Sequence, residues 1–192
     1  MELVRENKNV SLNEVLNTQG LVFGGIDYSV GKMIGQDFND PNNIVHHVIG
    51  SWHNLFYAEA NKYDVFKAFG VSNGVVNISI VASNNAQIDP GSIKTNLIPK
   101  INRDNLNELA KTYHFDNEKG FAIVFVQEYY CKPYQNASYW VIAVRKTDKE
   151  VVFAKPMPVD AKSGFGFKNY WATTILSLLS EIKNRQKSWK RR

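Results

Sequence analysis

The chain has 192 residues, of which 44% are apolar, and it is rich in aromatic residues, with 11 Phe, 9 Tyr and 4 Trp. This composition excludes wholesale disorder, and no apolar run approaches the roughly 18 residues that a membrane span needs. The single cysteine, Cys131, excludes an internal disulfide and a multi-cysteine metal site. The opening MELVRENKNV is polar, so we expect either a cytoplasmic protein or a periplasmic or otherwise exported one whose signal has been removed.

The formal net charge of +5 is concentrated at the carboxyl terminus. Residues 183–192, KNRQKSWKRR, hold six of the 23 Lys and Arg, and the rest of the chain carries 17 basic and 18 acidic residues, a net charge of −1. We interpret this basic tail as a solvated helix end, where cations complement the helix dipole. The alternative is a contact with nucleic acid or acidic lipid. The residues that would make it are Lys187, Trp189, Lys190, Arg191 and Arg192.

The first part of the chain predicts a short helix, a strand and a capped helix start. Residues 12–19 are weakly helical before Gly20. Residues 21–30 have strand character, and the Gly24–Gly25 pair predicts a bulge there. Residues 36–43 form a loop that ends in Asp40–Pro41, a pair typical of a helix start because Asp caps free amides and Pro fits the first turn.

A helix over 41–60 is the clearest element, because its apolar residues recur every three or four positions. They are Ile44, Val45, Val48, Ile49, Trp52, Leu55 and Phe56. Residues 63–69 fit a helix or a strand equally. The alternation in VVNISIVA predicts a strand over 75–82.

The last part of the chain predicts a helix over 103–114, three strands and a terminal helix. The strands are 121–130, apolar on both faces, 138–146 and 150–157, and TDKE makes a tight turn before the third. The inner face of the terminal helix would carry Trp171, Ile175, Leu178, Leu179 and Ile182. The element order indicates an α/β fold, with α+β as the alternative: a mixed sheet covered by two or three helices. One domain over 21–182 would follow a polar segment, 1–20, and precede the basic tail.

Three segments within residues 106–157 carry a resemblance to a known family. LAKTYHFD, GFAIVFV and RKTDKEVVF resemble the core pattern of the amino-terminal domain of TolB and of the curli-secretion lipoproteins. Lys149 stands where the turn of that pattern has glycine. In its overall sequence character, and not through a signature motif, the chain also resembles uncharacterised exported proteins of the Bacteroidetes group. These resemblances imply a periplasmic binding or assembly module, and they bring no catalytic residues.

The stretch KSGFGFKNYWATT, residues 162–174, matches only the beginning of a dinucleotide-binding G-x-G-x-x-G loop. Asn169 occupies the third glycine position, and the stretch precedes the last helix instead of following a first strand. We interpret it as a strand-to-helix corner whose glycines adopt unusual angles, with Phe165 and Phe167 packed on the helix below. The alternative is a ligand contact at the helix start, through Gly164, Gly166 and Asn169.

Other polar residues offer weaker candidates. His46 and His53 lie seven residues apart on one helix face, about 10 Å, which is too far for one metal ion. DFNDPNN departs from the calcium-loop pattern and is interpreted as a capping loop. Asp27 and Tyr28 follow the first strand, and ligands of open α/β sheets bind beyond the carboxyl ends of strands, so both are candidate ligand residues.

These observations predict a non-catalytic binding or assembly module of the bacterial cell envelope, with a protein as its partner. They predict no cofactor and no metal. The alternative is a cytosolic protein, either a small enzyme with an unrecognised site or a weak nucleic-acid binder that uses the tail.

Overall fold

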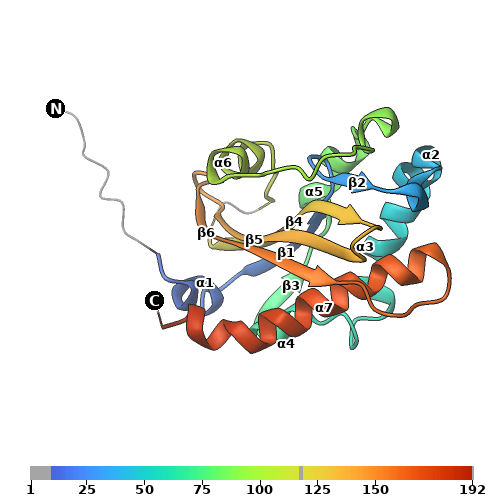
Figure 1. Cartoon of the computed structure of the whole chain (residues 1–192). Coiled ribbons are helices and arrows are strands. Elements are labelled where there is room, and N and C mark those ends of the chain that lie inside the picture. Colours follow the sequence, from blue (N-terminus) through green and yellow to red (C-terminus); the bar gives the residue numbers. More distant parts are fainter. Residues whose placement is uncertain (1–9, 117–118, 192) are drawn as a thin grey trace.

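The computed structural model describes residues 10–116 and 119–191. Its centre is a six-stranded mixed sheet in the order β3-β1-β4-β5-β6, with β2 paired to β4 beyond the end of β1 (Figure 1). The pairs β1–β3, β1–β4 and β2–β4 are parallel, whereas β4, β5 and β6 form an antiparallel meander. The strands are β1 (Leu21–Asp27), β2 (Lys32–Ile34), β3 (Gly74–Val76), β4 (Phe121–Cys131), β5 (Asn136–Arg145) and β6 (Val151–Asp160).

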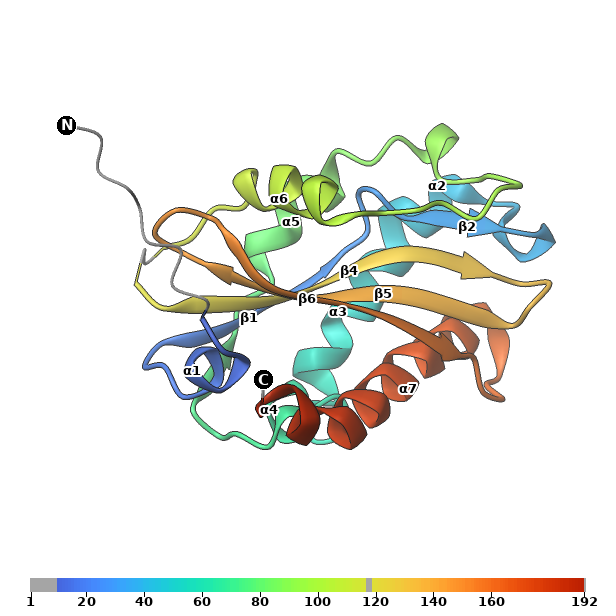
Figure 2. The same cartoon turned by 60° about the vertical axis from the view of Figure 1, so that its left-hand side comes forward.

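Helices cover both faces of this sheet, which confirms the predicted α/β class. Figure 2 shows α6 on one face and α4 and α7 on the other. The helices are α1 (Leu12–Leu16), α2 (Pro41–Asn43), α3 (Ile49–Ala58), α4 (Val65–Phe69), α5 (Ser79–Ala86), α6 (Arg103–Lys111) and α7 (Gly166–Trp189), with the short helices η1 (Gln36–Phe38) and η3 (Pro90–Ser92) and a π-helix, η2 (Ile44–Val48), between α2 and α3. No helix in the described segments is both long enough and apolar enough to cross a bilayer.

Two hydrophobic clusters hold the layers together. The larger joins α1, α3, α4 and α7 to one sheet face, and the smaller joins α5 and α6 to the other. The apolar stripe predicted for 41–60 is confirmed, since Ile44, Trp52 and Phe56 are all buried. The terminal helix also buries its predicted inner face, and Leu12, Val15 and Leu16 of α1 extend the packed unit into the polar first segment.

Side-chain caps mark where several helices begin. The Asp40 carboxylate accepts a hydrogen bond from Asn43 N at 3.0 Å, with Pro41 in the first turn, as predicted. Asp64 caps α4 in the same way, through Lys67 N at 2.8 Å, and Gly70 ends that helix with a φ of 69°. The ambiguous segment 63–69 is therefore a helix.

The predicted strand over 75–82 is wrong beyond Val76. Asn77 Oδ1 accepts hydrogen bonds from Ser79 N at 3.1 Å and from Ser79 Oγ at 2.6 Å, a local turn that ends β3. Helix α5 then starts at Ser79 and buries Ile80 and Val81 against the sheet. The apolar alternation is real, but the asparagine side chain redirects the backbone after three strand residues.

Aromatic rings fill the space between the sheet and α7. The rings of Tyr130 and Trp171 stack with centroids 4.8 Å apart. A line of hydroxyls crosses this apolar layer, from Tyr130 Oη to Tyr139 Oη at 2.9 Å and on to Thr174 Oγ1 at 2.7 Å. Burial raises the pKa of both tyrosines well above the ordinary value, so they stay neutral and the line stays hydrogen-bonded.

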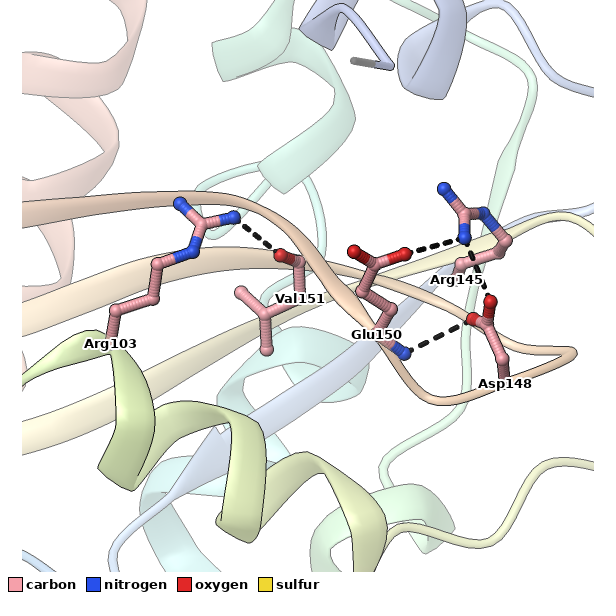
Figure 3. A network of polar contacts seen from close by, with 5 residues as sticks. All are labelled: Arg103, Arg145, Asp148, Glu150 and Val151. Atoms are coloured by element: carbon pink, nitrogen blue, oxygen red, sulfur yellow. Dashed lines mark hydrogen bonds and ion pairs between the residues drawn. The ribbon is translucent and has the colours of Figure 1, made fainter. Parts of the chain in front are cut away.

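Ion pairs stabilise the turn between β5 and β6 (Figure 3). Arg145 Nη1 lies 2.8 Å from Asp148 Oδ2 and 2.7 Å from Glu150 Oε2. Lys149, between them, has a φ of 58°, a left-handed backbone conformation that glycine adopts more readily than other residues. Arg103 of α6 donates from Nη2 to Val151 O at 2.6 Å, so the network also anchors a helix to the start of β6.

Arg145→Ala is expected to lower the free energy of unfolding by about 1 kcal/mol, because it unpairs two carboxylates at a strained turn. The matched control is Arg185→Ala, which removes a single exposed pair with Glu181 on α7. That control should cost only about 0.3 kcal/mol. Urea unfolding of both variants, at low and high salt, measures the difference. Equal losses would show that the turn network adds nothing beyond an ordinary surface pair.

Candidate functional site

Asp27, the first predicted ligand residue, is completely buried at the end of β1. Its Oδ1 accepts hydrogen bonds from Ser29 N at 2.8 Å and Ser29 Oγ at 2.5 Å, and its Oδ2 accepts one from Asn84 Nδ2 at 3.0 Å. The Tyr113 hydroxyl lies close by: burial, and then the negative charge of Asp27, raise its pKa well above the ordinary value. The carboxylate thus holds the β1–β2 turn against α5.

Side chains of two helices continue the hydrogen bonding of β1 where β3 has ended. Asn85 of α5 accepts from Tyr28 N at 2.8 Å and donates to Ile26 O at 2.9 Å. His53 of α3 places Nε2 2.8 Å from Ile26 O and 3.2 Å from Ile26 N. Buried backbone groups need such partners. The Asn85 side chain therefore acts as a substitute strand: it makes the two hydrogen bonds to β1 that a neighbouring strand would otherwise make.

Tyr28, the second predicted ligand residue, points into the aromatic core. Its ring packs 5.7 Å from that of Trp52, centroid to centroid, and its burial raises its pKa well above the ordinary value. A ligand that reached Asp27 or Tyr28 would have to displace side chains that hold the sheet and helices together. Both residues therefore have structural contacts in place, and their role as ligand residues stays a prediction.

The glycine stretch, residues 162–174, leads from β6 into α7 and is a strand-to-helix corner, the first of the two interpretations given above. Gly166 has a φ of 77°, and a Cβ on Gly164 would lie 2.9 Å from the backbone of Asn169. Asn169 Nδ2 donates to Phe165 O at 3.0 Å, which closes the first turn of α7. Trp52 Nε1 donates to Lys168 O at 2.9 Å, so the Trp52 ring lies between this corner and Tyr28.

The expectation for the two phenylalanines is half right. Phe167 packs against Phe38 with ring centroids 5.7 Å apart, edge to face. Phe165, in contrast, is 95% exposed. It is the residue just before α7, and the positive φ of Gly166 turns the chain into the helix after it.

The basic segment is a continuation of α7 as far as Trp189. Trp189 packs on Phe153 of β6 with centroids 5.6 Å apart, and Lys190 Nζ donates to Phe69 O at 2.8 Å. These two side chains secure the helix end to β6 and α4. Lys187 and Arg191 are exposed, and Arg192 lies outside the described residues.

The histidines and the DFNDPNN loop, the remaining polar candidates, do not come together in one site. His46 is exposed and His53 is buried, so the predicted shared face is split. Asp37, in the loop once compared with calcium sites, pairs with Lys132 Nζ at 2.9 Å. Within 10–116 and 119–191, no group of three His, Cys, Asp or Glu side chains is arranged to hold a metal ion.

Two further buried ionisable groups are also bonded within the fold. Glu128 accepts hydrogen bonds from Ser138 Oγ at 2.7 Å and from Ile101 N at 3.0 Å. Lys146 Nζ donates to Gly20 O at 3.0 Å, and burial lowers its pKa. Like Asp27 and His53, these side chains connect segments that are distant in sequence.

Sequence reasoning missed a surface that four loops build at one end of the sheet. We define this loop end as residues 35–40, 93–100, 132–135 and 161–169. Polar contacts link these loops in series: Lys94 Nζ to Asn39 Oδ1 at 3.2 Å, Lys132 to Asp37, and Ala161 N to Gln135 O at 2.8 Å. Figure 2 shows the end of β2, the β4–β5 turn and the start of α7 on the same side of the molecule.

The loop end gathers exposed apolar side chains. Phe165 is 95% exposed, Leu97 77%, Tyr134 69% and Ile98 49%. A signal for it exists in the sequence: IKTNLIPK, KPYQ and AKSGFGFKN are loop segments that combine apolar residues with lysines and contain no acid. This signal does not predict a shared surface, because no periodicity links residues that come together from separate loops.

A groove of about 410 Å³ lies between the end of β6 and α7. Its polar lining includes Asn136, Asp160, Lys162, Ser177, Glu181 and Arg185. Three of these side chains are already engaged, because Ser177 Oγ donates to Asp160 O at 2.8 Å and Arg185 pairs with Glu181. None of the predicted ligand residues lines this groove.

Asn85→Ala is expected to lower the free energy of unfolding by about 1 to 3 kcal/mol, because it leaves the buried Tyr28 N–H without a partner and removes one of the two side-chain contacts of Ile26 O. Ser83→Ala, an exposed substitution on the same helix, is the control and should change stability by less than about 0.5 kcal/mol. Chemical denaturation measures both. A small loss for Asn85→Ala would contradict its role as a substitute strand.

Stability is expected to fall as the pH drops from about 7 to about 5, because His53 is buried. Burial lowers the pKa of His53, against opposing effects of the Ile26 backbone and Asp27, so the unfolded chain binds a proton before the folded one. His53→Gln should flatten this slope, and His46→Gln, an exposed change, should not. Thermal unfolding at a series of pH values is the measurement, and an unchanged slope in His53→Gln would refute the assignment.

Comparisons of this chain with protein family models, with curated proteins and with solved structures find no match.

Proposed function

We propose that this chain is a non-catalytic binding or assembly module of the bacterial cell envelope, and that it meets its partner through the loop end. The observation that carries the proposal is the exposure of Phe165, Leu97 and Tyr134 at that end. Large apolar side chains gathered on a protein surface are typical of interaction sites. The four side chains come from three loops, which the fold holds together on one side.

The use of the interior polar groups supports the non-catalytic part of the proposal. A general acid, base or nucleophile needs a side chain that can reach a substrate. Asp27, His53 and Glu128 each form hydrogen bonds within the fold. Cys131 is buried and pairs with Ile34 on one side and Asn136 on the other.

The envelope location rests on the resemblance of residues 106–157 to the TolB and curli-secretion pattern. The nucleic-acid alternative has less support, since Trp189 and Lys190 are engaged in packing and hydrogen bonding at the end of α7.

Photocrosslinking in the native host tests the proposal. A benzoylphenylalanine at position 165 should yield a discrete crosslinked product in the envelope fraction, because this side chain would lie in the contact. The same group at position 75, an exposed valine of β3, is the matched control and should yield none. Equal products from both positions, or products from position 75 alone, would overturn the assignment of the contact surface.

A further inference from the structure

The four exposed apolar residues of the loop end lie in three separate loops. Phe165 directly precedes α7, Tyr134 lies in the tight β4–β5 turn, and Leu97 and Ile98 follow the segment that pairs with β2. With 95% of its surface exposed, Phe165 projects into solvent. Projecting apolar tips suit a surface into which they can insert, such as the interfacial layer of a bilayer.

Basic residues surround these tips. Segments 93–100, 132–135 and 161–169 contain five lysines and no Asp or Glu. The five are Lys94, Lys100, Lys132, Lys162 and Lys168. Lys100, Lys162 and Lys168 are exposed. The loop end thus combines apolar tips with unbalanced positive charge within the segments that carry them.

Two acids of the loop end, Asp37 and Asp40, offset part of this charge, so five lysines and two aspartates leave a net charge of +3. Asp37 pairs with Lys132, and Asp40 caps α2. Asp89 accepts a hydrogen bond from Gly91 N at 2.9 Å, and Asp160 ends β6 beside the groove. In addition, α7 begins at Gly166, so the positive end of the dipole of a 24-residue helix lies at the loop end.

We propose that the loop end docks onto an anionic bilayer surface, with Phe165, Leu97, Ile98 and Tyr134 inserted at the interface and the lysines against lipid phosphates. This inference rests on the proposed function and names the partner of the same surface. Flexible lysine ammonium groups contact phosphates without a fixed geometry, and tyrosine favours the membrane interface. The contact is peripheral, and attraction to anionic lipid adds to apolar insertion.

Vesicle flotation with the full chain tests this inference. The chain should bind vesicles that mix phosphatidylcholine with phosphatidylglycerol and should bind pure phosphatidylcholine vesicles far more weakly. Leu97→Ser with Phe165→Ser should weaken binding by more than about tenfold. The matched control is Tyr57→Ser with Val75→Ser, two exposed apolar residues near the β3 edge, and it should bind as the unmodified chain does.

A second pair of variants tests the charge. Gln at positions 100, 162 and 168 should weaken binding by more than about tenfold, and high salt should do the same to the unmodified chain. Gln at 67, 183 and 187 removes three exposed lysines from α4 and the far part of α7 and should have little effect. All these side chains are exposed, and unchanged circular dichroism would show that the variants fold.

Three outcomes would overturn the lipid inference. They are absence of binding to either vesicle, binding independent of phosphatidylglycerol, and binding lost only in the variant at 67, 183 and 187. The crosslinking experiment separates this failure from that of the proposed function. A protein crosslinked to position 165, together with absence of vesicle binding, would retain the contact surface and reject the bilayer as its partner.

Discussion

The structure depends on β4, an eleven-residue strand that has both faces largely buried and both edges paired. Every backbone N–H and C=O of such a strand needs a partner inside the protein. On one edge β5 supplies it from Phe121 to Cys131, with one register shift at Glu128. On the other edge β1 is too short, so the chain leaves the edge after Asp27 and rejoins it as β2, which runs in the same direction and pairs with Tyr129–Cys131. Gly31 in the β1–β2 turn leaves no room for a Cβ, which would collide with the Gln127 side chain.

This break in the sheet edge explains why the most site-like polar cluster is bonded within the fold. Where β1 leaves β3, buried backbone groups of Ile26 and Tyr28 need donors and acceptors, and Asn85 supplies both. Asp27 and Asn84 secure the turn itself. Polar residues at the carboxyl end of a strand are therefore ambiguous from sequence, because a ligand site and a strand junction need the same side chains.

The length of α7 separates two positively charged regions. At about 1.5 Å per residue, its 24 residues span about 36 Å, from Gly166 to Trp189. One end holds the glycine corner and the exposed Phe165, beside acid-free loops. At the other end, Lys190 and Trp189 bond and pack against α4 and β6. The end with the higher charge density is thus the better packed, and the exposed apolar side chains lie at the other.

Local patterns were enough to predict the α/β class, the helical run that begins at Pro41, the irregularity at Gly24–Gly25 where the β1–β4 register shifts, the meander and the inner face of α7, because periodicity, caps and turn residues act over a few neighbouring positions. Local pattern could not separate β3 from α5, since the two hydrogen bonds that Asn77 Oδ1 accepts from Ser79 outweigh an alternating pattern. The burial of Asp27 and Tyr28 and the exposure of Phe165 depend on the packed fold, and so does the meeting at one end of loops that lie 60 residues or more apart in sequence, around Lys94 and Phe165. Burial depends on which segments meet in space, and that is set by sheet order and strand length, which no local pattern encodes.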